Sequence, residues 1–153
     1  MAPAPHQRWL TIVGIGEDGI EGLLPTARTA IKNAELVVGG ARHLALAALM
    51  LQGEALSWPA PLSDAFPAIL AKRGRKVAVL ASGDPFCYGV GSLLTELVPV
   101  AETHCIPAPS AFSLACSRLG WSMQDTATLS ACGRPLEAVV PLLQPGRRIL
   151  LLS

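Results

Sequence analysis

Short apolar runs that stop abruptly at glycine or proline constrain this sequence more than any other feature. The runs at residues 9–16, 35–40 and 76–81 are rich in valine, leucine and isoleucine, as buried strands are. A fourth strand is expected at residues 100–107 and should be more exposed. Segments of helix-forming composition follow them at residues 25–34, 41–50, 62–73, 89–98 and 109–120. Ser63 or Asp64 is expected to cap the helix of residues 62–73. The alternation predicts an α/β fold with a doubly wound, mostly parallel sheet.

The character of the chain changes after Trp121. The segment "WSMQDT" is polar and indicates a linker, and the residues after it suggest one strand–helix–strand unit that stops on the apolar run "RRILLLS". Because a domain rarely ends on such a strand, we expect the start of a second α/β domain here. The expected parts are a flexible tail of residues 1–8, an N-terminal domain of residues 9–125, and a truncated C-terminal domain of residues 126–153.

Composition and charge disfavour two classes of function. The chain has 153 residues, 51% of them hydrophobic and 15% charged, and a net charge of +1 gives no electrostatic basis for binding nucleic acid. Its longest apolar helical stretch, residues 44–51, is much shorter than the ~18 residues that a membrane span needs. The N-terminus lacks the pattern of a signal peptide. We therefore predict a cytoplasmic protein.

The cysteines are predicted to be free thiols, because none of them forms a CxxC pair. They are Cys87, Cys105, Cys116 and Cys132. The three histidines are scattered along the sequence, so no cluster of metal ligands is expected. The one basic cluster, "KRGRK" at residues 72–76, is interpreted as the solvated C-terminal end of a helix.

Three loops rich in glycine or proline follow predicted strands. They are "GIGEDG" at residues 14–19, "SGDPFCYG" at 82–89 and "PAPSA" at 107–111. Open parallel sheets bind ligands at the carboxyl ends of their strands, and glycine lets a ligand approach the backbone. Taken singly, Asp84 is a turn former before a proline and Ser110 is a helix N-cap. Three such loops on one sheet predict a ligand site.

The first loop has the G-x-G-x-x-G spacing of dinucleotide-binding proteins, since Gly19 follows Gly14 and Gly16. These proteins also place an acidic residue after the next strand, about 20 residues on. Here Glu35 precedes its strand instead. An oxidoreductase that binds NAD therefore stays open as an alternative.

Longer stretches resemble the tetrapyrrole methylases, a family of S-adenosylmethionine-dependent methyltransferases of cobalamin and sirohaem synthesis. The stretches are "VGIGEDGIEGLL", "SGDPFCYG" and "PAPSAFSLACSRLGW". Within the family, "AELVVGGARHL", "LASGDPFCYGVG" and "LSACGRPLEAVVPLLQPGRRILLLS" are similar to the precorrin-6Y methylase branch. The resemblance covers nearly the whole chain after the tail.

The resemblance implies an S-adenosylmethionine site in the cleft between two domains. The contacts implied for this chain are Ser82, Gly83, Asp84, Cys87, Ser110 and Ala111. Leu152 would be the first contact from the second domain. Methyl transfer from a sulfonium needs no metal, and alignment and exclusion of water account for most of the catalysis. No catalytic residue is therefore assigned.

The sequence departs from the family pattern at two positions. Glu17 stands where the family usually has a proline, and Cys132 stands where the branch often has a histidine. The contacts or roles of the usual residues cannot be carried over to either position.

The function implied by the resemblance is C-methylation of a corrin precursor, precorrin-6Y, in cobalamin biosynthesis. The implied partners are the tetrapyrrole substrate, a second copy in a homodimer, and a decarboxylating methyltransferase domain or subunit. The chain by itself is expected to be inactive, because it supplies only part of the cleft. Two further alternatives stay open: another methylase of the family, such as one acting on ribosomal RNA or diphthine, and a noncatalytic cofactor-binding module.

Overall fold

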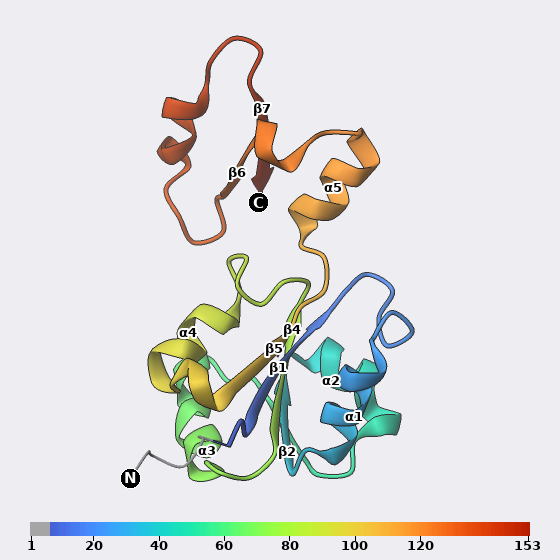
Figure 1. The fold of residues 1–153 in the computed structure, drawn as a ribbon. Helices are drawn as coiled ribbons and strands as arrows, with labels where there is room; N and C mark the ends of the chain where they lie inside the picture. The colour runs from blue at the N-terminus through green and yellow to red at the C-terminus, as the bar shows by residue number, and fades with distance from the viewer. Residues whose placement is uncertain (1–6) are drawn as a thin grey trace, which may run out of the picture. The chain divides into compact units, whose positions relative to one another are not determined.

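The computed structural model describes residues 7–153, so residues 1–6 of the expected tail lie outside the described range. The chain divides into two compact units, Met1–Ala108 and Pro109–Ser153 (Figure 1). The division of the protein into domains of residues 9–125 and 126–153 remains a prediction.

The first unit is built on a five-stranded sheet in which all neighbouring strands are parallel. The strands are β1 (Leu10–Ile15), β2 (Leu36–Gly39), β3 (Glu54–Ser57), β4 (Val77–Ser82) and β5 (Thr103–Ile106). Their order in the sheet is β3-β2-β4-β1-β5. This arrangement confirms the predicted α/β fold with a mostly parallel sheet.

Helices cover both faces of this sheet, with α1 and α2 on one side and α3 and α4 on the other (Figure 1). They are α1 (Pro25–Asn33), α2 (Ala41–Ala47), α3 (Phe66–Ala71) and α4 (Val90–Leu97), and the 3₁₀ helices are Ala48–Met50, Leu62–Ala65 and Val100–Glu102. Successive strand residues point to opposite faces, so Val13 packs with Ile31 of α1 while Ile12 packs with Leu94 of α4. Burial on both faces explains the nearly continuous apolar runs.

Two elements differ from the sequence-based expectation. Strand β3 was not predicted, because it lies at the sheet edge and its four residues are largely exposed, which leaves little apolar signal. The helix expected at residues 62–73 is a 3₁₀ turn followed by the short α3, and neither Ser63 nor Asp64 caps it through its side chain. Pro67 lies in the first turn of α3, where its missing N–H is tolerated.

The second unit contains α5 (Ala111–Leu119) and a two-stranded parallel sheet of β6 (Thr126–Ser130) and β7 (Arg148–Leu152). Short 3₁₀ helices occupy Met123–Asp125 and Leu136–Leu142. The segment expected as a helix at residues 134–143 is thus 3₁₀ over Leu136–Leu142, and Pro141 within it disfavours an α-helix, because its ring would clash with the carbonyl four residues earlier.

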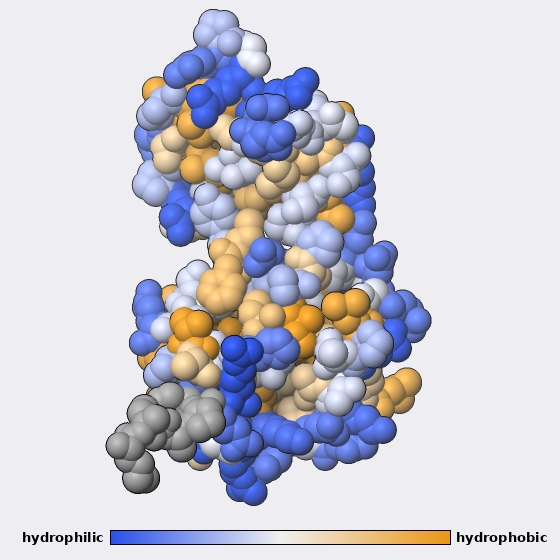
Figure 2. Space-filling view, in the orientation of Figure 1, coloured by the Kyte–Doolittle hydropathy of each residue, from blue (hydrophilic) through white to orange (hydrophobic). Residues whose placement is uncertain are grey.

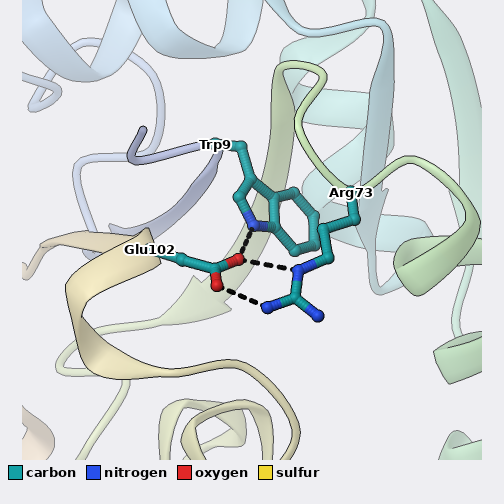
Figure 3. Close-up of polar contacts among 3 residues, drawn as sticks. All are labelled: Trp9, Arg73 and Glu102. Atoms are coloured by element: carbon teal, nitrogen blue, oxygen red, sulfur yellow. Dashed lines mark hydrogen bonds and ion pairs between the residues drawn. The ribbon is translucent and has the colours of Figure 1, made fainter. Parts of the chain in front are cut away.

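A buried carboxylate holds together the segments before β1, β4 and β5, at the amino ends of these strands (Figure 3). Glu102 is 5% exposed, and its Oε2 accepts hydrogen bonds from Trp9 Nε1 at 2.6 Å and Arg73 Nε at 2.9 Å. Arg73 Nη2 donates to Oε1 of the same carboxylate. This hydrogen bond and the negative charge raise the pKa of Arg73. The cluster thus lies at the amino ends of the strands, whereas the glycine-rich loops lie at their carboxyl ends.

Two other charges of the basic cluster are also paired. Lys72 Nζ lies 3.5 Å from a carboxylate oxygen of Glu54, and Arg75 Nε lies 2.8 Å from one of Glu35. The predicted helix end is therefore exposed, as expected, but its side chains connect α3 to neighbouring strands.

The surface of the first unit mixes hydrophobic and hydrophilic patches on the face that Figure 2 shows. Among residues 7–153, no helix is long and apolar enough to cross a membrane. Within the same range, no three His, Cys, Asp or Glu side chains are grouped so that they could hold a metal ion.

Candidate functional site

The sheet topology identifies where the first unit would bind a ligand. Strands β1 and β4 are neighbours, but the helices that follow them, α1 and α4, pack on opposite faces of the sheet. Open α/β sheets bind ligands at the carboxyl ends of strands where the chain connections diverge in this way. The loops after β1 and β4 are the first two glycine-rich loops of the sequence.

The backbones of the loops after β1, β4 and β5 touch one another. Gly83 N donates to Ile15 O at 2.8 Å, and Ala108 N donates to Gly83 O at 3.1 Å. A Cβ on Gly14 would lie 1.9 Å from Gly83 O and 2.6 Å from Ala108 N. Gly14 is therefore required by close packing, and the expected meeting of strand-end loops at one edge of the sheet is confirmed for these residues.

The loop after β4 carries four of the predicted cofactor contacts and holds its own shape. Ser82 ends the strand with an exposed side chain, and Gly83 follows with φ of +59°, a conformation that favours glycine. Asp84 Oδ1 accepts from Phe86 N at 2.9 Å, and Asp84 O accepts from Cys87 N at 3.0 Å. The carboxylate of Asp84 thus stiffens the turn, as Asx turns do.

Tyr88 in the same loop has a strained backbone. Its φ is +52°, which is uncommon for a bulky residue, and its side chain is 46% exposed. Phe86 is similarly exposed, at 47%. Strained residues persist where the surrounding structure holds them, and they gather at binding sites. The loop therefore exposes two aromatic side chains, and Ser82 at its start is exposed as well.

His43 is a site residue that sequence reasoning missed. It lies in the first turn of α2, and its Nε2 is 3.3 Å from Ser82 Oγ. Burial lowers the pKa of His43, and the positive charge of Arg42 lowers it further. The available signal was the position of His43 in "VVGGARHL", just past the carboxyl end of β2, which neighbours β4 in the sheet.

The two remaining predicted contacts lie in the second unit. Ser110 is the N-cap of α5, and its Oγ accepts from Ser113 N at 3.1 Å. Ala111 is the first residue of the helix. The structure thus gives Ser110 a capping role, and its contact with a cofactor, like that of Ala111, remains a prediction.

The four cysteines are free thiols, and their surroundings predict an order of reaction. Cys132 is exposed and is expected to be alkylated first, whereas Cys116 is 3% exposed and should react last. Burial and the nearby charge of Asp84 raise the pKa of the Cys105 thiol, which should slow its reaction. Time-resolved iodoacetamide labelling with mass spectrometry measures this order. A denatured sample without reductant should show four thiols, and early labelling of Cys116 would contradict the packing of α5.

Known proteins resemble this chain in sequence and in fold. Residues 9–151 match the family described as tetrapyrrole (corrin/porphyrin) methylases. A precorrin-6Y C(5,15)-methyltransferase (decarboxylating) from Sinorhizobium is 51% identical over 99% of this chain, and the chain spans 37% of its length. A cobalt-precorrin-7 C(5)-methyltransferase from Salmonella typhimurium is 36% identical over 82% of this chain and 62% of its own length.

The fold agrees with these sequence matches. The crystal structure of a precorrin-6Y methylase from Archaeoglobus fulgidus matches 97% of this chain and 73% of its own with a TM-score of 0.68 and 26% identity. The family predicted from the sequence is confirmed, and members of the predicted branch are among its relatives. The chain belongs to the tetrapyrrole methylase family.

Proposed function

We propose that this chain is the cofactor-binding part of an S-adenosylmethionine-dependent methyltransferase that acts on a corrin precursor in cobalamin biosynthesis. The observation that carries the proposal is the close packing of Gly14, Gly83 and Ala108. These residues bring three backbone segments together at the carboxyl ends of the strands, where open α/β sheets bind ligands, in a chain of the tetrapyrrole methylase family. The names of the relatives supply the class of substrate.

The relatives also suggest which carbon is methylated. The chain aligns with proteins named for methylation at carbons 5 and 15 and with one named for carbon 5 alone. The chain spans 37% of the first kind, and 82% of the chain aligns with 62% of the second, so the region that both kinds share lies within this chain. We therefore assign this chain to methylation at carbon 5 of the macrocycle.

The residues of the loop after β4 fit the cofactor. Gly83 offers backbone without a Cβ, Ser82 an exposed hydroxyl, and Phe86 and Tyr88 exposed aromatic surface, which suits a ligand with apolar, polar and charged parts. S-adenosylmethionine supplies a methyl group activated by the positive charge on sulfur. The loops bind and orient, because rigid alignment can contribute ~7–11 kcal/mol to such a bimolecular transfer.

The family and the names of the relatives also suggest partners for this chain. The decarboxylating step named for the Sinorhizobium relative belongs, in this proposal, to a second methyltransferase domain or subunit. We also propose that the protein forms a homodimer. Separately, we propose that Cys87, Ser110 and Ala111 are among the residues that contact the cofactor. The substrate is precorrin-6Y or the precorrin derived from it.

Replacing Gly83 with valine tests the cofactor site. A β-branched residue at φ of +59° is strained and places a side chain where the cofactor would approach. We expect S-adenosylmethionine to bind at least ~100-fold more weakly, which equals about 2.7 kcal/mol. Calorimetry on the full-length protein measures the affinity, and transfer of labelled methyl to a precorrin measures activity.

Gly74→Val is the matched control, because Gly74 has φ of +83° with open space around it and lies in the turn before β4. It should destabilise the fold similarly while leaving the affinity unchanged. Wild-type affinity in Gly83→Val would contradict the assignment of the loop. Binding of NAD in place of S-adenosylmethionine would favour the oxidoreductase alternative, although the strand order here differs from the dinucleotide-binding order 3-2-1-4-5-6.

A further inference from the structure

The contact between His43 and Ser82 joins two adjacent strand ends. His43 follows β2 through Gly40, and α2 is anchored there by Ala47, which is fully buried. Strand β2 pairs with β4, whose last residue is Ser82. The imidazole Nε2 thus comes within 3.3 Å of the hydroxyl of Ser82 from a fixed helix.

Burial and the neighbouring positive charge of Arg42 lower the pKa of His43, and both therefore favour the neutral ring. A neutral imidazole has one nitrogen that donates and one that accepts, and a serine hydroxyl can do either. In both tautomers the contact occupies one hydrogen-bonding position of the hydroxyl. The other positions of Ser82 stay available to a ligand.

We propose that His43 is a positioning residue for the cofactor: it holds the hydroxyl of Ser82 in the one orientation that S-adenosylmethionine uses. The proposal rests on the proposed function. Ser82 is exposed, and a serine without a partner samples three staggered χ1 wells and three hydroxyl orientations. Fixing both would improve affinity by at most about ninefold, which sets the size of the expected effect.

This role differs from a purely structural one because the contact lies at the exposed edge of the sheet. An exposed hydrogen bond between side chains contributes little to folding. The effect of removing His43 should therefore appear in cofactor affinity and in KM for S-adenosylmethionine, with little change in the thermal midpoint or in kcat.

A double-mutant cycle on the full-length protein tests the proposal. The variants are His43→Ala, Ser82→Ala and the double variant, and calorimetry measures the affinity for S-adenosylmethionine. We expect His43→Ala to weaken binding about three- to ninefold in the wild-type background and to have no further effect when Ser82 is already alanine. His43→Gln, whose amide can reach the same hydroxyl, should restore most of the affinity.

His104→Ala is the matched control, because His104 is an exposed histidine within β5 rather than at a strand end. It should bind like the wild type. Additive losses in the double variant, or unchanged affinity in His43→Ala, would overturn the positioning role while leaving the methyltransferase proposal intact. Failure of the wild-type protein to bind S-adenosylmethionine would instead overturn the proposed function itself.

Discussion

Replacing Gly14 with alanine is expected to disrupt both the fold of the first unit and its cofactor site. The added Cβ would lie 1.9 Å from Gly83 O and 2.6 Å from Ala108 N, and both are backbone atoms that cannot rotate away. The carboxyl ends of β1, β4 and β5 would have to separate, which breaks the hydrogen bond between Ala108 N and Gly83 O. We expect a loss of about 3 kcal/mol or more in the free energy of unfolding.

Urea denaturation measures this loss, and calorimetry should show at least ~100-fold weaker binding of S-adenosylmethionine. Gly16→Ala is the control, because its Cβ would meet only the Cβ of Ala108, at an ordinary 3.7 Å. This variant should keep nearly wild-type stability. A folded Gly14→Ala variant with normal affinity would show that the three loops do not meet as described.

Replacing Glu102 with glutamine is expected to cost about 2–3 kcal/mol of stability while leaving the cofactor site intact. The carboxylate is buried and accepts from both Trp9 and Arg73, and an amide has only one oxygen to offer them. An amide N–H would then face a donor across a buried contact. Chemical denaturation followed by fluorescence measures the change, and the affinity for S-adenosylmethionine should stay unchanged, since the cluster lies at the opposite edge of the sheet.

Glu54→Gln provides the comparison. Glu54 is 72% exposed and pairs with Lys72 across 3.5 Å, a type of surface pair that contributes only ~0–1 kcal/mol. Equal stability losses in Glu54→Gln and Glu102→Gln would mean that burial of the carboxylate has no energetic importance.

The buried elements of the fold could be predicted from the sequence. Strands β1 and β4 are covered on both faces, so their residues are almost all apolar and their pattern is unmistakable. Strand β3 escaped prediction because an edge strand exposes most of its side chains and needs only one neighbour to form. The segment of residues 134–143 has helical composition, but Pro141 within it disfavours an α-helix, and the segment is 3₁₀ instead.

The candidate site was found in part. The glycines and Ser82 stood out because they follow buried strands directly, where open parallel sheets bind their ligands. An aspartate before a proline suits both a turn and a ligand contact. The hydrogen bond from Phe86 N to Asp84 Oδ1 shows the first, and contact of Asp84 with the cofactor remains a prediction. His43 was overlooked because its position after β2 becomes informative only once β2 is known to pair with β4, whose last residue is Ser82, 39 positions away.

The sequence alone determined the alternation of strands and helices, the three strand-end loops and the family, because each depends on local composition and short motifs. Only the tertiary structure decided the strand order β3-β2-β4-β1-β5. That order makes β1 and β4 neighbours, so that Gly14 faces Gly83, and it brings His43 to Ser82 and Trp9 to Glu102. The physical reason is that strand pairing joins segments far apart in the sequence. The packing of helices against both faces of the sheet selects the strand order, and no single residue or short motif indicates it.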